Sequence, residues 1–205
     1  MVSSLQILPA ADLRRIHRVQ SITILWMSIE VVVGMWAAWR SLSPAMTAFA
    51  GDSAIELFSA VVVLWRFRSP SVGELEERRA ARITGTLLFL LAAYVLVVSA
   101  LALLGYREAR PTYLGITLLL AAIVIMPWLA REKRRLSFRT GSAALRADAA
   151  ESALCAYLSL VALAGLALNA IWHISWADPA AAIVITPLIV WEGREAFRGK
   201  ACGCC

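Results

Sequence analysis

The sequence predicts an all-α membrane protein whose fold is a bundle of six transmembrane helices. Of its 205 residues, 60% are hydrophobic and 17% are charged, and the mean hydropathy is +0.73. A soluble domain is nearer half apolar and a quarter charged. The apolar residues form long runs that alternate with short arginine-rich stretches, which is typical of polytopic helical membrane proteins. This composition excludes a soluble enzyme, a disordered chain and a nucleic-acid-binding protein, despite the net charge of +6.

Six segments are apolar enough to be membrane-spanning helices, which need about 20 residues to cross roughly 30 Å of hydrocarbon. In chain order they are residues 19–39, 44–65, 83–105, 112–130, 143–172 and 177–191. The fifth begins with a polar, amphipathic turn, and the sixth is short and contains Pro187. We therefore divide the chain into an amphipathic segment (1–18), a six-helix transmembrane domain (19–192) and a short cysteine-containing tail (193–205).

The basic residues predict the orientation of these helices. Seventeen of the 20 lysines and arginines lie in the amino-terminal segment, in the connections after the second and fourth spans, and in the tail. The other connections carry only Arg40, Arg107 and Arg110. Because lysine and arginine collect on the cytoplasmic side, we expect a multi-pass protein of the inner (plasma) membrane with both termini in the cytoplasm. Basic runs can also bind nucleic acid, but topology explains their placement, and we expect no nucleic-acid partner.

Acidic side chains inside the apolar spans mark the candidate functional site, because an ionisable group in the hydrocarbon core is costly. The third, fourth and sixth spans have no acid in their cores. The remaining spans contain five acids, accompanied by one cysteine: Glu30 in the first, Asp52 and Glu56 in the second, and Asp148, Glu151 and Cys155 in the fifth.

The spacing of these residues places them on common faces. Asp52 and Glu56 are four residues apart, as are Glu151 and Cys155, so the members of each pair lie one turn apart on one face. Asp52 lies about 12 Å of helical rise from the outer end of its span, and Glu151 lies at a comparable distance from the cytoplasmic end. The two acids are therefore expected to meet near the bilayer midplane. The similarity of residues 52–56 (Asp-Ser-Ala-Ile-Glu) to 151–155 (Glu-Ser-Ala-Leu-Cys) is either an inverted repeat or accidental.

Three carboxylates and a thiol in a low-dielectric space cannot all stay ionised without a cation, so the cluster either shares protons or binds a divalent metal. Oxygen ligands with at most one sulfur suit Zn²⁺ or a similar ion better than Cu⁺. The alternative is that the acids pair with arginines or cap helices, but no arginine lies in a span core. We therefore expect a metal site formed by Asp52, Glu56, Glu151 and Cys155, although Cys155 could equally be a small packing residue.

Four stretches carry a resemblance to a known family: residues 29–30, 52–56, 147–152 and 177–179. At these positions the sequence resembles the transmembrane part of the cation diffusion facilitator (cation efflux) family of divalent-metal/proton antiporters, over roughly residues 15–195. The fifth-helix pair of zinc-transporting members is His-x-x-x-Asp, whereas this chain has Glu151 and Cys155. The second-helix pair here is Asp52 and Glu56, rather than two aspartates or a histidine and an aspartate. The sequence lacks the soluble cytoplasmic carboxy-terminal domain of many members.

The resemblance implies a homodimeric secondary transporter that exports a divalent cation in exchange for protons and has no permanent cofactor. Zn²⁺ is the first choice of cargo, and Cd²⁺, Co²⁺, Mn²⁺ and Fe²⁺ are alternatives. A different class of function is a non-transporting membrane metal sensor or partner-binding subunit. An enzyme is not expected, because the sequence has no His-Glu-x-x-His motif and no Gly-x-x-x-x-Gly-Lys loop.

Four further residues could serve the path of ions or protons. Asp148 lies one turn toward the cytoplasm from Glu151 and could guide ions to the site. Glu30 could relay protons, or it could hydrogen-bond neighbouring helices through Ser28 or Ser59. His173 and Asp178, near the outer end of the last two spans, could line an exit or simply be solvated.

The tail cysteines Cys202, Cys204 and Cys205 are expected to be thiols in the reducing cytoplasm. They could capture a soft metal ion, or they could be a tolerated chain end.

Overall fold

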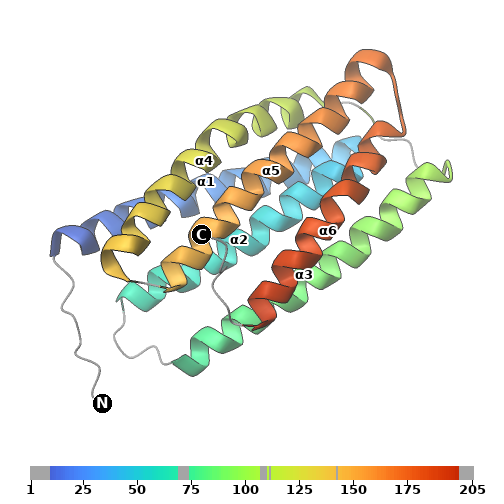
Figure 1. The fold of residues 1–205 in the computed structure, drawn as a ribbon. Coiled ribbons are helices and arrows are strands. Elements are labelled where there is room, and N and C mark those ends of the chain that lie inside the picture. The colour runs from blue at the N-terminus through green and yellow to red at the C-terminus, as the bar shows by residue number, and fades with distance from the viewer. Residues whose placement is uncertain (1–9, 69–73, 107–109, 111, 142, 199–205) are drawn as a thin grey trace.

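The computed structural model describes residues 10–68, 74–106, 110, 112–141 and 143–198, and within them it contains six α-helices (Figure 1). The helices are α1 (Ala10–Ser41), α2 (Pro44–Arg68), α3 (Glu74–Leu103), α4 (Tyr113–Thr140), α5 (Ala143–Trp172) and α6 (Ala177–Arg198). Five of them, α1 to α5, are long and apolar enough to cross a membrane. The uncharged stretch of α6, residues 179–191, would span only about 20 Å. The expected all-α fold of a multi-pass membrane protein is confirmed.

The largest departure from the expected boundaries is at the end of α4. This helix was expected to stop at residue 130, but it continues for ten residues through the basic run to Thr140. No glycine or proline interrupts residues 129–140, and the stop comes at Gly141, whose φ of 65° is the left-handed conformation that favours glycine. At its other end the Thr112 side chain caps α4 by accepting the N–H of Gly115 at 3.4 Å. Residues 131–140 therefore belong to a helix and not to a loop.

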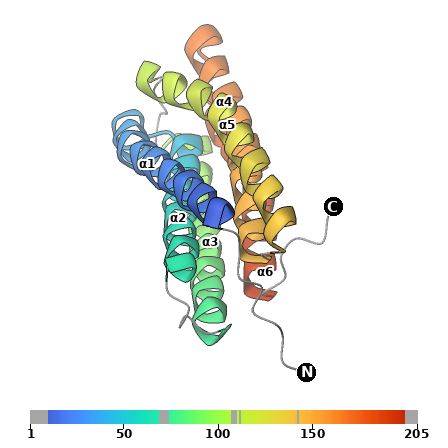
Figure 2. The same ribbon diagram turned by 90° about the vertical axis from the view of Figure 1, so that its left-hand side faces the viewer.

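Short connections make consecutive helices antiparallel neighbours in most cases. Around the bundle the order is α1, α2, α3, α6, α5 and α4, and α2 also contacts α5 across the centre. In Figures 1 and 2 the described start of α1 and the described end of α6 lie at the same end of the bundle. This placement agrees with an even number of crossings.

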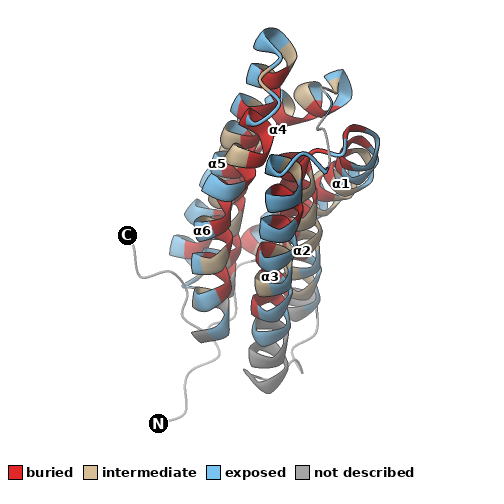
Figure 3. Ribbon diagram, turned by 90° about the vertical axis from the view of Figure 1, so that its right-hand side faces the viewer, coloured by how far each residue is buried: buried red, intermediate tan, exposed pale blue. Residues whose placement is uncertain are grey.

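Apolar side chains occupy both the interior and the outer surface of the bundle. Figure 3 shows buried residues facing the inside of the bundle and exposed residues facing outward. Met27, Phe49 and Leu119 are fully buried, whereas Val32 and Val124 on the outside are 70% and 72% exposed. An outer surface with so many large apolar side chains suits contact with hydrocarbon and not with water.

Helices α3 and α6 approach each other at a pair of glycines. A Cβ atom added to Gly85 would lie 2.8 Å from the carbonyl oxygen of Gly193, and one added to Gly193 would lie 3.2 Å from the Cβ of Leu88. Small residues let two membrane helices pack backbone to backbone in this way. The crossing brings the neighbouring residues Thr84 and Glu192 to the inner side of the helix pair.

Candidate metal-binding site

A small cavity lies among α2, α3, α5 and α6, and its volume of about 10 Å³ is close to the minimum that holds one water molecule. Seven residues line it. Four are the acids Asp52, Glu56, Glu151 and Glu192, and the other three are Ile55, Thr84 and Leu88. Three of the four expected metal-binding residues, Asp52, Glu56 and Glu151, therefore meet at one cavity. Asp52 and Glu56 are each only 4% exposed.

Two of the cavity acids have oxygen atoms with no hydrogen-bond partner among the described residues. These buried atoms are the Oε2 atoms of Glu56 and Glu151. Each of the two side chains also accepts a hydrogen bond from a serine: Ser152 donates to Oε1 of Glu56 at 2.6 Å, and Ser59 donates to Glu151. A buried carboxylate oxygen without a donor is costly, so the cavity has free acceptors that a cation would satisfy.

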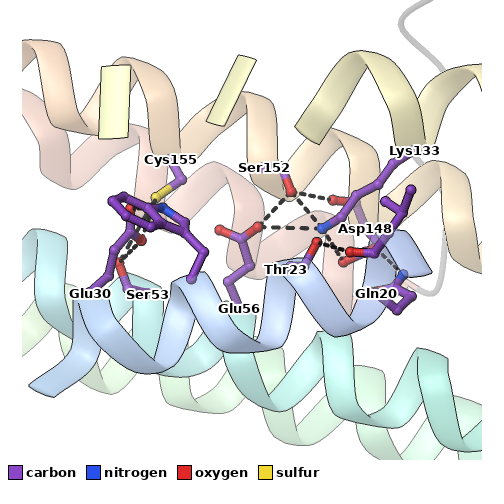
Figure 4. Close-up of polar contacts among 11 residues, drawn as sticks. Gln20, Thr23, Glu30, Ser53, Glu56, Lys133, Asp148, Ser152 and Cys155 are labelled. Atoms are coloured by element: carbon purple, nitrogen blue, oxygen red, sulfur yellow. Dashed lines mark hydrogen bonds and ion pairs between the residues drawn. The ribbon is translucent and has the colours of Figure 1, made fainter. Parts of the chain in front are cut away.

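Figure 4 shows a lysine, Lys133, whose side chain points toward Asp148, Ser152 and the cavity residue Glu56. Lys133 of α4 is fully buried, and its ammonium group lies 2.9 Å from Oδ1 of Asp148 and 2.7 Å from Oγ of Ser152. The same ammonium group lies 3.8 Å from Oε1 of Glu56. From α1, Gln20 donates to the other oxygen of Asp148 at 2.6 Å. Glu56 thus borders both the cavity and a polar network that joins α1, α4 and α5.

The buried position of Lys133 corrects our expectation that this residue lies in the cytoplasmic connection. The structure also bears on the alternative that the acids form ion pairs: no arginine lies in a span core, but Lys133 pairs with Asp148. The physical reason is the extension of α4, which carries Lys133 on its buried face together with Leu136 and Ser137. Asp148, expected on the ion path, is engaged in this network.

A second polar group surrounds Glu30, which is fully buried. Its Oε1 accepts the indole N–H of Trp26 at 2.6 Å, and its Oε2 accepts the hydroxyl of Ser53 at 3.0 Å. Of the two residues suggested by the sequence, Ser28 instead donates to the carbonyl of Ile24, and Ser59 donates to Glu151. Glu30 therefore does hydrogen-bond a neighbouring helix, but through Ser53.

Cys155 belongs to this second group. Its Sγ lies 4.0 Å from Oε2 of Glu30 and 4.0 Å from Oγ of Ser53, and it does not line the cavity. Within the described part of the chain, no three His, Cys, Asp or Glu side chains are arranged to hold a metal ion as they stand. The cavity acids surround a space without converging on one point, so metal binding requires them to draw together.

Comparison with known families identifies the bundle. Residues 76–200, which include most of α3 and all of α4 to α6, match the sequence profile described as the cation efflux transmembrane domain. The match covers 125 of the 205 residues. The chain belongs to the cation efflux family. No curated protein matches it.

Membership in the cation efflux family makes this protein a membrane domain for cation export and not an enzyme, as the sequence predicted. The matched part of the chain contains Lys133, Glu151 and Glu192, whereas Asp52 and Glu56 precede it. The acids of α2 therefore lie outside the matched residues, but they line the same cavity as Glu151 and Glu192.

At the other end of the cation efflux bundle, Asp178 lies in the first turn of α6 and is buried, with 1% exposure. Ser43 donates to its Oδ1 at 2.6 Å, while its Oδ2 is without a partner among the described residues. His173 is exposed in the connection before α6 and has a positive φ of 54°. Neither residue lines the cavity. The tail cysteines Cys202, Cys204 and Cys205 lie outside the described residues.

Sequence reasoning missed two residues of the site, Lys133 and Glu192. The signal for Lys133 is its spacing from Leu129 and Leu136, which continues the buried stripe of α4 by three or four residues at each step. Glu192 follows Trp191, where the last span was expected to end. The missed signal there is Gly193, because a small residue within a membrane helix often marks a close helix contact.

Proposed function

We propose that this cation efflux protein exports a divalent metal ion in exchange for protons and that Asp52, Glu56 and Glu151 bind the metal. The observation that carries the proposal is the cavity in which carboxylates of α2, α5 and α6 face one another at the centre of the bundle. A divalent ion there would satisfy the unpaired Oε2 atoms of Glu56 and Glu151. Glu192 is a fourth acid that lines the same cavity and completes the proposed set.

Proton exchange follows from the chemistry of this set. A metal binds ionised carboxylates, so its arrival at a cavity of protonated acids releases protons. When the metal leaves, the acids again need protons to avoid buried charges without partners. Each transport cycle therefore moves protons opposite to the metal. Zn²⁺ is the first metal to test, but a ligand set made only of oxygen also suits Mn²⁺, so the choice among divalent ions must be measured.

We place Cys155 beside the metal site rather than in it, since its thiol faces Glu30 and Ser53. The thiol also interacts with Glu56, one of the proposed ligands, but Cys155 does not line the cavity. Asp148 is proposed to shape the cytoplasmic approach together with Lys133. The proposed roles of Glu30 in proton transfer and of Asp178 and His173 at the exit rest on their positions along the bundle.

We also propose that both termini face the cytoplasm. The support is the concentration of exposed basic side chains at the end of the bundle where α1 begins and α4 ends: Arg14, Arg15, Arg131, Arg134, Arg135 and Arg139. A homodimer is proposed as well. The outer face of α3 offers a surface for it, with Leu90 at 63% and Tyr94 at 52% exposure. A monomeric mass in both mild detergent and lipid nanodiscs would contradict the dimer.

The test is metal flux into proteoliposomes that contain a metal-sensitive and a pH-sensitive dye, across a panel of Zn²⁺, Cd²⁺, Co²⁺, Mn²⁺ and Fe²⁺. We expect metal movement in one direction to drive protons in the other. Asp52→Asn and Glu151→Gln should abolish both signals. The matched control is Glu132→Gln on α4, because Glu132 pairs with Arg15 and Arg135 away from the cavity.

Each result separates the parts of the proposal. Wild-type flux in a well-expressed Asp52→Asn or Glu151→Gln variant would refute the ligand assignment. Metal flux that moves no protons would refute antiport and leave a facilitator. Metal binding without any flux would instead favour a membrane metal sensor.

A further inference from the structure

Lys133 is a buried charged group that takes no part in metal binding or proton exchange in the proposed transport cycle. Its ammonium group is fully enclosed and is held in place by Asp148 and Ser152, at 2.9 and 2.7 Å. Gln20 fixes Asp148 from the opposite side at 2.6 Å. A lysine held by several short contacts at once has little freedom to leave its position, so its positive charge is a permanent part of the site.

Glu56 is the residue through which this charge meets the cavity. Its Oε1 accepts the hydroxyl of Ser152 and lies 3.8 Å from the ammonium group of Lys133, while its Oε2 has no partner among the described residues. Because Glu56 also lines the cavity, the same carboxylate is available to the lysine on one side and to a metal on the other. The Lys133 ammonium group and a bound metal ion would therefore compete for the negative charge of the Glu56 carboxylate.

We infer that Lys133 is a tethered cation that competes with the transported metal for Glu56 and thereby weakens metal binding. This inference rests on the proposed function, because it takes the cavity to be the metal site. The repulsion between an ammonium group and a divalent ion a few ångströms apart is substantial in a medium of low dielectric constant. A weakened site releases its cargo more readily, which an exporter needs in order to turn over. Lys133 thus lowers the metal affinity of the site through Glu56 and does not itself bind the metal.

The test measures Zn²⁺ and Mn²⁺ affinity of the full chain in lipid nanodiscs by isothermal titration calorimetry. Lys133→Met keeps most of the side-chain length and removes the charge. We expect its metal affinity to rise by about tenfold or more. In proteoliposomes the KM for metal should fall and kcat should fall with it, because release becomes slower. A purely structural role for Lys133 would weaken metal binding instead.

Two further variants keep the test decisive. Lys133→Met leaves Asp148 without its cation, which can prevent folding or create a new ligand. The double variant Lys133→Met/Asp148→Asn removes both charges of the pair, an exchange that proteins often tolerate. It should still gain affinity, but less than the single variant, because the Asp148 carboxylate that attracts the metal is also removed. Arg134→Met is the matched control, since Arg134 is the adjacent basic residue and is exposed. Its affinity should equal that of the wild type.

The outcomes distinguish this inference from the proposed function. If the wild-type chain binds metal and the folded double variant binds it with equal or lower affinity, the competition is refuted while the transport proposal stands. If the wild-type chain and all variants bind no divalent metal, the proposed function fails and the inference fails with it.

Discussion

Replacing Ser43 with alanine should destabilise the bundle, because one hydroxyl group serves two helices. The Ser43 side chain precedes α2 and accepts the N–H of Met46 at 2.9 Å, which caps the helix, and Pro44 occupies the favoured first position. The same hydroxyl donates to Oδ1 of Asp178 at 2.6 Å and so connects the starts of α2 and α6. Both Ser43 and Asp178 are 1% exposed, so water cannot easily replace either bond.

The size of the effect follows from these two bonds. Loss of a serine cap costs about 1 kcal/mol, and loss of a donor to a buried carboxyl group costs about 1.5–3 kcal/mol. The backbone N–H of Ala45 also donates to the Asp178 carboxyl group and offsets part of the second loss, whereas Oδ2 of Asp178 is without a described partner. Ser43→Ala should therefore lower the free energy of unfolding by roughly 2–4 kcal/mol.

The measurement is unfolding in mixed detergent micelles with increasing dodecyl sulfate, followed by the fluorescence of the eight tryptophans. Ser43→Thr retains the hydroxyl and should stay close to the wild type. Ser21→Ala removes an exposed hydroxyl from α1 and controls for the substitution itself. If Ser43→Ala unfolds within about 0.5 kcal/mol of the wild type, a range typical of neutral surface changes, the hydroxyl does not join the helices as described.

Three further predictions test the packing and the ligand set. Gly85→Val would press a side chain against an α6 backbone oxygen 2.8 Å from the Cβ position. It should lower the free energy of unfolding by about 1–3 kcal/mol and reduce metal flux. Ala100→Val on the exposed face of α3 should change neither stability nor flux. Cys155→Ala should keep metal flux within about twofold of the wild type, a difference of less than 0.5 kcal/mol, and complete loss in a well-expressed variant would make Cys155 a ligand. Gln20→Leu removes the donor to Oδ2 of Asp148 and should lower stability by about 1–3 kcal/mol with unchanged metal preference; an altered preference in the flux panel would argue against a supporting role.

The meeting of Asp52 and Glu151 could be predicted because it depends only on helix geometry. Two apolar helices of opposite direction, each with an acid at a similar distance from its end, bring those acids to one level. The period of the helix then places Glu56 on the same face as Asp52. These relations hold for any straight membrane helix, so they do not depend on how side chains pack.

Details that depend on packing could not be predicted in the same way. Cys155 is one turn from Glu151, which corresponds to about 6 Å along α5, and this displacement is enough to put it next to Glu30. Lys133 was assigned to a loop because four of its nearest neighbours in the sequence are charged, Arg131, Glu132, Arg134 and Arg135. Its burial is decided by the helical phase of α4, which orients Lys133 inward while Arg134 and Arg135 remain exposed.

The glycine crossing of α3 and α6 has a mechanical consequence for the cavity. Since no side chain separates the two backbones at Gly85 and Gly193, we expect α3 and α6 to move together as one unit. Thr84 and Glu192 stand next to this joint and form one wall of the cavity, while α2 and α5 form the other. The volume of the cavity is thus set by the distance of the α3–α6 pair from α2 and α5. A small tilt of the α3–α6 pair would therefore move Thr84 and Glu192 together and enlarge or reduce the cavity.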